Sequence, residues 1–236
     1  MVISIRKNVS CYASAAQQEL LADISKIEPI AKNFFLTGGT GLSVFYLHHR
    51  VSEDLDLFAT EFNELDSIDI ILKRTFKREL TLIQSSREFL SYLINNVKVD
   101  FVFDPLSLHI ERPRVHIESG ETIQIDRIEN IASNKLCAIT SRSEPKDLVD
   151  FYFISHVGWK GSEEAGFLNC YNEAKKKEAL LDDPAMAAYQ LEELLKRVLA
   201  ERENALPGMR KEIDWVVFED TYKNFVDIMY RMEHWS

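Results

Sequence analysis

The sequence predicts an α+β fold, with a mixed β-sheet and flanking helices followed by a C-terminal helical subdomain. Two observations support this prediction. Before residue 157, short alternating or apolar runs interleave with segments of helical period. After residue 162, only helical period remains. A glycine-containing segment at residues 157–161 separates the two patterns, so we expect domains of residues 1–157 and 158–236.

The composition is that of a globular protein with a full core. The 236 residues are 46% hydrophobic and 28% charged, which excludes a disordered tail, a collagen-like repeat and a coiled-coil rod. The cysteines Cys11, Cys137 and Cys170 are far apart, which argues against a disulfide framework or a zinc ribbon. Because the sequence has neither a membrane-length apolar run nor a secretory signal, we expect a cytoplasmic protein without membrane contact. The net charge of −10 argues against a dedicated duplex-DNA binder but leaves room for local basic patches.

The first elements follow from the spacing of apolar residues. Residues 14–26 carry leucine and isoleucine on one side of a helix. Residues 34–36 form an apolar run that predicts a buried strand, and the glycines at 38–39 predict a tight turn after it. A short helix is expected over residues 42–48, and strict alternation predicts a half-buried strand over residues 54–58.

The remaining elements alternate between the two periods and then become helical. They are a helix over residues 65–78, strands over 80–83, 89–94, 97–103, 115–117 and 122–125, and helices over 128–140, 147–154, 185–202 and 220–232.

A glycine-rich turn between strand and helix is the first candidate for a binding site. Its residues are Gly38, Gly39, Thr40 and Gly41. Glycine lets the backbone approach a ligand closely, and the unpaired N–H groups at a helix start suit a phosphate. The Thr40 hydroxyl is expected to bind the same phosphate. Gly41 occupies a place where a helix former is expected, so the sequence leaves the first residue of the helix open.

Two aspartates on the next strand suggest a metal site. Asp54 and Asp56 are two residues apart, so their side chains leave the same face of the strand. Mg²⁺ prefers oxygen ligands and commonly bridges carboxylates to substrate phosphates. A third carboxylate on a neighbouring strand would complete a site for two metal ions. Asp100, on the alternating strand at residues 97–103, is the first choice, and Asp104, near the end of that strand, is the second.

Each of these features alone has an ordinary structural explanation, and only their order along the chain favours a functional site.

Other motifs that would indicate a different kind of site are incomplete in this sequence. The glycines lack the Lys-Ser/Thr of a P-loop, and Ser52 lacks the glycines of a nucleophile elbow. His48 and His49 are adjacent, so they diverge on a helix and cannot chelate a metal together. The lysines at residues 175–177 are most simply a solvated face.

In this order the residues resemble the nucleotidyltransferase-fold signature that is shared with DNA polymerase beta and the poly(A) polymerases. The Gly-Gly-Thr at residues 38–40 and the segment at residues 49–58 are similar, more specifically, to the AbiEii/MenT-type toxin nucleotidyltransferases. The block at residues 135–151 resembles later motifs of that family, a helical lysine and arginine followed by Lys-Asp-x-x-Asp. The resemblance extends over about residues 35–154 and does not cover the C-terminal third.

The resemblance implies a role for each matching residue. It implies catalysis by Asp54, Asp56, Asp100, Lys135 and Asp147, nucleotide binding by Gly38, Gly39, Thr40, Arg50, Lys135 and Arg142, and magnesium binding by Asp54, Asp56 and Asp100. Lys135 would neutralise triphosphate charge, and Arg142, seven residues later, lies on the same helical face. Asp150 lies three residues after Asp147 on the same side of the helix. A role in the site and an ordinary role as a capping or surface carboxylate are equally compatible with this position.

The implied function is a magnesium-dependent nucleotidyltransferase that moves a nucleoside monophosphate from an NTP to an acceptor hydroxyl. The fold analogues suggest RNA as acceptor, and the toxin relatives suggest the tRNA 3′ end. The chain would then be the toxin of a bacterial toxin–antitoxin or phage-defence pair, with a cognate antitoxin as partner. Two alternatives stay open. One is transfer to a small molecule such as an aminoglycoside, which suits the acidic net charge, or to a protein; the other is a non-catalytic nucleotide-binding partner module.

Overall fold

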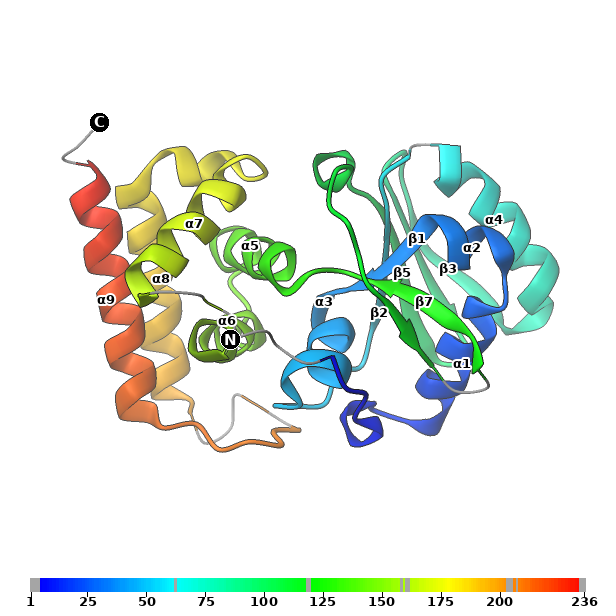
Figure 1. Ribbon diagram of the computed structural model, residues 1–236, viewed down its shortest axis with the longest axis horizontal. Coiled ribbons are helices and arrows are strands. Elements are labelled where there is room, and N and C mark those ends of the chain that lie inside the picture. The colour runs from blue at the N-terminus through cyan, green and yellow to red at the C-terminus, as the bar shows by residue number, and fades with distance from the viewer. Residues whose placement is uncertain are drawn as a thin grey trace. The chain divides into compact units, whose positions relative to one another are not determined.

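The computed structural model describes residues 5–61, 63–117, 120–157, 159, 162–202, 206 and 208–233. It divides into two compact units between Arg127 and Ile128 (Figure 1). This division lies before residue 157, where the sequence pattern changes, because the helices that follow Arg127 pack on later helices. The expected domain limits of residues 1–157 and 158–236 stay predictions. In the described ranges, no helix is both long and apolar enough to cross a membrane.

The N-terminal unit is built on one seven-stranded sheet with the order β3-β4-β5-β2-β1-β7-β6. The strands are β1 (Phe34–Thr37), β2 (Leu55–Ala59), β3 (Leu80–Ser85), β4 (Phe89–Ile94), β5 (Val97–Phe103), β6 (Arg114–His116) and β7 (Thr122–Ile125). β1 is parallel to β7 and β2 is parallel to β5, whereas the other neighbours are antiparallel. The mixed sheet expected from the sequence is therefore confirmed.

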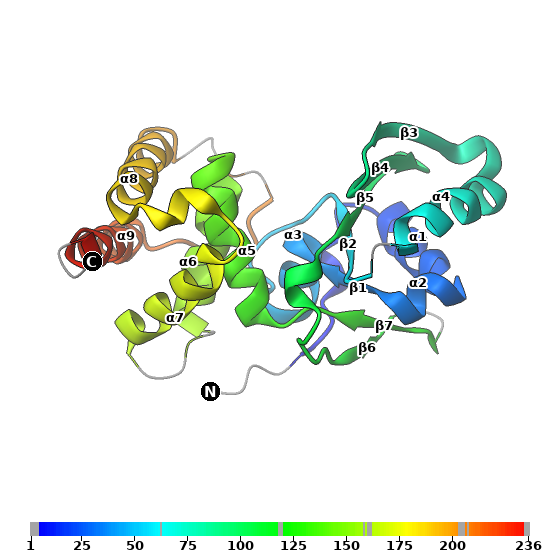
Figure 2. The ribbon, with the colours of Figure 1, turned by 90° about the horizontal axis from the view of Figure 1, so that it is seen from above.

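Three helices of this unit, α1 (Ala15–Ser25), α2 (Glu28–Asn33) and α4 (Asn63–Phe76), cover one face of the sheet (Figure 2). α2 packs on β1 and β7, α4 packs on β3, β4 and β5, and α1 contacts β5. The alternate residues Leu55 and Leu57 of β2 are fully buried. The opposite alternation brings Asp54 and Asp56 to the other face of the sheet, away from this apolar core.

The hairpin of β4 and β5 shows how local sequence sets the register. Asn95 and Asn96 both have positive φ, 52° and 62°, which a two-residue type I′ turn requires and which asparagine tolerates. The turn joins Ile94 and Val97 as a pair, and from there the register places Ser91 opposite Asp100. Two polar residues therefore face each other on the same side of the sheet.

The C-terminal unit is helical in all of its described elements. They are α5 (Ile128–Ser141), α6 (Pro145–Val157), α7 (Glu163–Lys175), η6 (Ala179–Asp182), α8 (Pro184–Ala200) and α9 (Trp215–Glu233). Its core includes Phe167 and Phe225, whose rings stack 4.4 Å apart. The helical subdomain expected from the sequence is confirmed. The sequence pattern did not predict α7, which begins where the Ser162 hydroxyl accepts a hydrogen bond from the Ala165 N–H.

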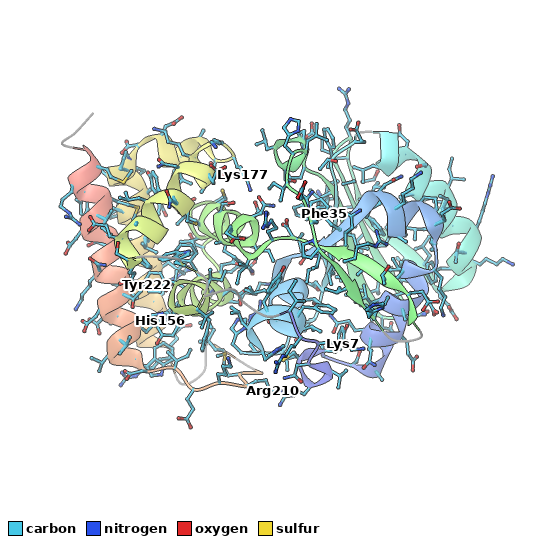
Figure 3. The ribbon with its side chains drawn as sticks, in the orientation of Figure 1. Lys7, Phe35, His156, Lys177, Arg210 and Tyr222 are labelled. Carbon is cyan, nitrogen blue, oxygen red and sulfur yellow. The ribbon has the colours of Figure 1, made fainter. Side chains whose placement is uncertain are left out.

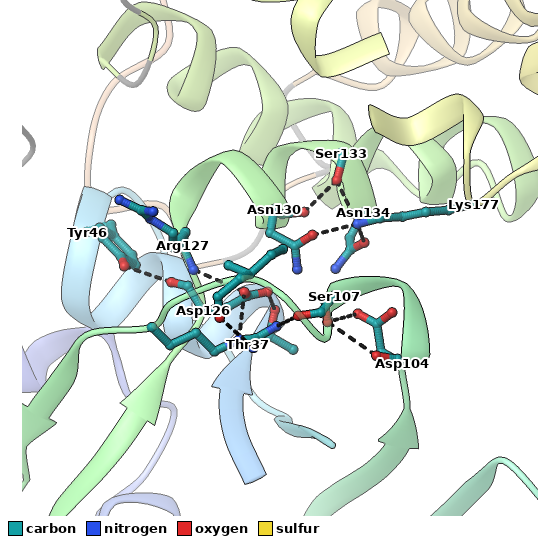
Figure 4. A network of polar contacts seen from close by, with 12 residues as sticks. Thr37, Tyr46, Asp104, Ser107, Asp126, Arg127, Asn130, Ser133, Asn134 and Lys177 are labelled. Carbon is teal, nitrogen blue, oxygen red and sulfur yellow. Dashed lines mark hydrogen bonds and ion pairs between the residues drawn. The ribbon is translucent and has the colours of Figure 1, made fainter. Parts of the chain in front are cut away.

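Lys177, expected to be solvated, instead connects α7 to α5. Its ammonium donates hydrogen bonds to Asn130 Oδ1 at 2.6 Å, Ser133 Oγ at 2.8 Å and Asn134 Oδ1 at 2.7 Å (Figure 4). The expectation of a solvated face at residues 175–177 is therefore wrong for this lysine. Three neutral oxygen acceptors on one helix give its ammonium the hydrogen bonds that water would otherwise supply.

Candidate active site

The glycine turn after β1 is built around close contacts. Helix α3 (Gly38–Thr40) begins directly after β1 and continues into a π-helical segment, η2 (Gly41–Leu47), so the helix starts earlier than residue 42. Gly38 has a φ of +62°, and a Cβ placed on it would lie 1.9 Å from Asp56 Oδ2. A Cβ on Gly39 would lie 2.6 Å from both Arg50 Nη2 and Ser52 Oγ. The glycines thus make room for a carboxylate and a guanidinium.

The Thr40 hydroxyl has protein partners in this structure. It donates a hydrogen bond to the carbonyl oxygen of Asp54 and accepts one from Gln17 Nε2 at 3.1 Å. Thr40 is fully buried, so its side chain holds the start of β2 against the glycine turn. The contact of the Thr40 hydroxyl with a phosphate, which the sequence led us to expect, stays a prediction.

A row of polar residues crosses the face of the sheet opposite the apolar core. Thr37 pairs with Asp56, Asp56 with Asp100, and Asp100 with Ser91. Asp126 follows Ile125, which pairs with Leu36, so Asp126 extends the row beside Thr37. Side chains of directly opposed residues leave the same face. The structure therefore brings two of the expected carboxylates, Asp56 and Asp100, side by side, with Asp54 two residues before Asp56.

Both carboxylate oxygens of Asp100 have protein partners. Ser91 Oγ donates to Oδ1 at 2.6 Å, and Lys98 Nζ lies 2.6 Å from Oδ2. Burial disfavours the charge of Lys98, but its hydrogen bond to Asp100 and the charges of Asp100, Asp54 and Asp56 outweigh burial and raise the pKa of this lysine. Lys98 therefore acts as a cation for all three carboxylates.

The chemistry of these three carboxylates fits a hard divalent cation, which binds carboxylate oxygens by preference. Their present positions do not yet form a chelate. Within the described part of the chain, no three histidine, cysteine, aspartate or glutamate side chains are gathered closely enough to hold a metal ion. The second-choice carboxylate, Asp104, accepts a hydrogen bond from Ser107 Oγ at 2.8 Å and lies beyond the end of β5.

Asp126 forms a second polar cluster at the end of the row, and the sequence patterns did not indicate it. Its Oδ2 accepts from Thr37 Oγ1 at 2.8 Å (Figure 4). Its Oδ1 pairs with Arg112 Nε at 3.3 Å. The Tyr46 hydroxyl donates to its carbonyl oxygen at 2.7 Å. Arg112 also lies over the ring of Phe35, 3.5 Å from its centroid (Phe35 is labelled in Figure 3). Asp126 thus ties the last residues of the N-terminal unit to the strand that leads into the glycine turn.

We expect Thr37→Val to weaken this cluster without changing the shape of the side chain. The buried Asp126 carboxylate loses one donor, which costs about 1–3 kcal/mol of unfolding free energy. Thr122→Val is the matched control, because the Thr122 hydroxyl accepts its hydrogen bond from Arg114 at an exposed site. Urea unfolding of both variants measures the change in unfolding free energy. Equal values for the two variants would show that the hydrogen bond from Thr37 to Asp126 does not stabilise the fold.

The C-terminal unit holds the other expected residues in a buried ion network. Lys135 Nζ lies 2.8 Å from Asp147 Oδ1 and 2.6 Å from Asp150 Oδ2. Arg142 donates to both oxygens of Asp147, each at 2.8 Å. Both aspartates are fully buried, whereas half of the Arg142 side chain is exposed. Lys135 and Arg142 therefore do point to one place, and Asp150 is an internal partner of Lys135 and no surface carboxylate.

The cations determine the charge state of this network. Burial opposes ionisation of Asp147, but Lys135 and the hydrogen bonds from Arg142 outweigh it and lower the pKa of the carboxyl group. The Tyr222 hydroxyl of α9, labelled in Figure 3, donates to the carbonyl oxygen of Leu148 beside the network. Burial, followed by the charge of Asp150, raises the pKa of Tyr222, so the phenol stays neutral. The roles of Lys135, Arg142 and Asp147 in catalysis and nucleotide binding stay predictions.

Comparison with known proteins places the chain in a family. Residues 19–228 match the family described as nucleotidyl transferase AbiEii toxin, type IV TA system. The chain belongs to this family of nucleotidyltransferases. The AbiEii match spans both units, including the C-terminal third that sequence motifs alone did not connect to it. The resemblance indicated by Gly38 and the Asp54–Asp56 segment is thereby confirmed.

Individual proteins are similar to the chain in sequence or in fold. An uncharacterised protein of Aquifex aeolicus (strain VF5) is 30% identical over 144 residues, which are 61% of this chain and 68% of that protein. The crystal structure of JHP933 from Helicobacter pylori aligns over 94% of both chains, with a TM-score of 0.52 and 18% identity. MenT4, a nucleotidyltransferase toxin of Mycobacterium tuberculosis H37Rv, aligns over 91% of this chain and 82% of its own, with a TM-score of 0.53 and 14% identity. The two solved structures share the fold.

Proposed function

We propose that this AbiEii-family chain is a toxin that transfers a nucleoside monophosphate from an NTP to RNA, at the 3′ end of tRNA, in a magnesium-dependent reaction. The observation that carries the proposal is the alignment of Asp56 with Asp100 across parallel strands, with Asp56 packed against Gly38. A phosphate-binding turn beside two carboxylates suits phosphoryl transfer, which depends on positioning and charge stabilisation. The protein would act in the cytoplasm and be held inactive by a cognate antitoxin.

The reaction assigns a role to each side chain. The acceptor hydroxyl oxygen bonds to the α-phosphorus of the NTP while the bond to the β-phosphate oxygen breaks and pyrophosphate leaves. Asp100, opposite Asp56, would accept the hydroxyl proton, and the backbone N–H groups of the turn at Gly38 and Gly39 suit the triphosphate oxygens. Asp54, Asp56 and Asp100 would hold Mg²⁺, which supplies positive charge for the phosphates and acidifies the attacking hydroxyl. Arg50, packed on Gly39, would bind phosphate.

A labelling experiment tests the acceptor. The full chain is incubated with Mg²⁺, each α-³²P-labelled NTP in turn, and either total tRNA, an aminoglycoside or a protein extract. We expect label from one NTP on the 3′ end of tRNA, and none with the double variant Asp54→Asn/Asp56→Asn, which keeps side-chain size but loses both charges. Circular dichroism of that variant confirms that it is folded.

The other outcomes distinguish the alternatives. Label on the aminoglycoside or on protein would replace the RNA acceptor, although the enzyme class would stand. No label on any acceptor, with folded wild-type protein, would favour a non-catalytic nucleotide-binding module.

A further inference from the structure

Lys98 occupies a distinctive place among the carboxylates. It lies on β5 two residues before Asp100, so both side chains leave the same face of the strand. Its ammonium is 2.6 Å from Asp100 Oδ2, and the charges of Asp54 and Asp56 also act on it. This lysine thus pairs with one of the three carboxylates that would hold a divalent cation and is attracted by the other two.

The two partners of Asp100 differ in charge, and this difference decides how the carboxylate can bind a metal. Its Oδ1 accepts the Ser91 hydroxyl at 2.6 Å and its Oδ2 pairs with Lys98 at the same distance. Each carboxylate oxygen has a second lone pair, so a hydrogen bond alone does not exclude a metal. A metal ion beside an ammonium at hydrogen-bond distance would meet strong like-charge repulsion. The Lys98 ammonium therefore has to move away when a metal binds Asp100, whereas the neutral Ser91 hydroxyl can stay.

Exposure shows that the lysine is able to move. Ser91 is 1% exposed and lies opposite Asp100 in the register of the β4–β5 hairpin, so its hydroxyl is an internal partner of the carboxylate. The Lys98 side chain is 40% exposed, against 11% for Asp100, and its four-carbon stem can swing the ammonium into water. The lysine is consequently the movable member of the group.

We propose that Lys98 is a placeholder cation that holds the Asp54–Asp56–Asp100 group together in the metal-free protein and is displaced when a divalent metal binds. This inference rests on the proposed function, because it requires that these carboxylates bind the metal. The lysine and the metal compete for the same carboxylate charge, so Lys98 lowers the metal affinity of the site. The metal-free protein is thereby spared the mutual repulsion of three carboxylates.

The test compares Mn²⁺ binding by wild type, Lys98→Met and Lys73→Met, with free Mn²⁺ measured by electron paramagnetic resonance. Methionine keeps an unbranched side chain of similar length and lacks the ammonium group and its charge. Lys73 is the matched control, because it forms an exposed ion pair with Asp69 at 2.7 Å on α4 and its loss changes the net charge equally. We expect Lys98→Met to bind Mn²⁺ tighter by on the order of tenfold, the effect of releasing one charge-assisted hydrogen bond, and Lys73→Met to bind as wild type does.

A second readout follows the lysine in the wild-type protein. Brief acetylation followed by peptide mass spectrometry reports how accessible each lysine is. We expect saturating Mn²⁺ to raise the acetylation of Lys98 several-fold and to leave that of Lys73 unchanged.

The outcomes separate this inference from the proposed function. If wild type and Lys98→Met bind Mn²⁺ equally, or the variant binds it more weakly, the placeholder role is wrong and the metal site stands. If neither protein binds Mn²⁺, the metal site and the placeholder role are both wrong.

Discussion

Gly38→Ala is expected to lower the rate of nucleotidyl transfer about a hundredfold, the cost of misplacing a reacting group by about an ångström. The Cβ of the alanine would lie 1.9 Å from Asp56 Oδ2, which is far too close for two atoms that are not bonded. Either the Asp56 side chain or the backbone of the turn must therefore move. The φ of +62° at this position adds backbone strain for any residue with a Cβ. Both effects act on the turn and carboxylate that the proposed reaction uses.

Gly120→Ala separates the two effects. Gly120 has a φ of +90°, and nothing lies within 4 Å of the Cβ that would be added there. This control therefore carries the backbone strain without displacing a carboxylate. Single-turnover transfer rates measure both variants, and thermal unfolding shows whether each is folded. Equal rates for Gly38→Ala and Gly120→Ala would show that the packing of Gly38 on Asp56 has no part in the reaction.

Lys135→Met is expected to cause the largest loss of stability, about 3–5 kcal/mol, because it leaves buried carboxylates without their ammonium. The side chains of Asp147 and Asp150 are fully buried and each lies within 2.8 Å of Lys135 Nζ. Lys146→Met is the control on the next helix. Lys146 pairs with Glu144 at 3.0 Å, and each of these two side chains is 44% exposed. Loss of this ion pair is therefore expected to change the free energy of unfolding by no more than about 1 kcal/mol.

A second substitution tests whether charge imbalance is the cause. Adding Asp150→Asn to Lys135→Met removes one of the two carboxylates and leaves Asp147 with Arg142, whose guanidinium donates to both of its oxygens. We expect the double variant to recover a substantial part of the lost stability. Failure to recover, with Lys146→Met unchanged, would indicate that Lys135 stabilises the helices by packing and not by charge.

The pH dependence of stability gives a further readout of the same network. Because the folded protein holds the pKa of Asp147 below its ordinary value of 3.8, its ionised form stabilises the fold above that pH. This contribution is lost as the pH falls below 3.8 toward the lowered pKa. The stability difference between wild type and Lys135→Met is therefore expected to be full near neutrality and to narrow in acid, as followed by urea unfolding at each pH.

Much of the site was predictable because its signals are local. A side-chain period of two put Asp54 and Asp56 on one face of β2, and a separation of seven residues put Lys135 and Arg142 on one face of a helical stretch. Glycine at position 38 is required by a positive φ, which is a property of that residue's own backbone. Each of these signals lies within a few residues of the chain.

The partners of those residues were not predictable from the same signals. Lys98 and Asp100 lie on the same strand, but only the pairing of β5 with β2 brings Asp56 opposite Asp100. The Thr40 hydroxyl was expected to face a ligand, but the approach of Asp54 to the glycine turn gives it a backbone partner instead. Asp126 follows a short strand, and no local pattern distinguishes it. Only the pairing of β7 with β1 brings it beside Thr37.

By itself, then, the sequence determined the mixed sheet, the helical C-terminal part, the carboxylate and glycine positions and the nucleotidyltransferase family. Only the tertiary structure decided that Asp56, Asp100 and Ser91 stand in one row and that Asp150 is an internal partner of Lys135. The physical reason is the range of the interactions. Periodicity and backbone conformation are set by neighbours along the chain, whereas strand register and ion pairs between distant segments are set by residues that meet only after folding.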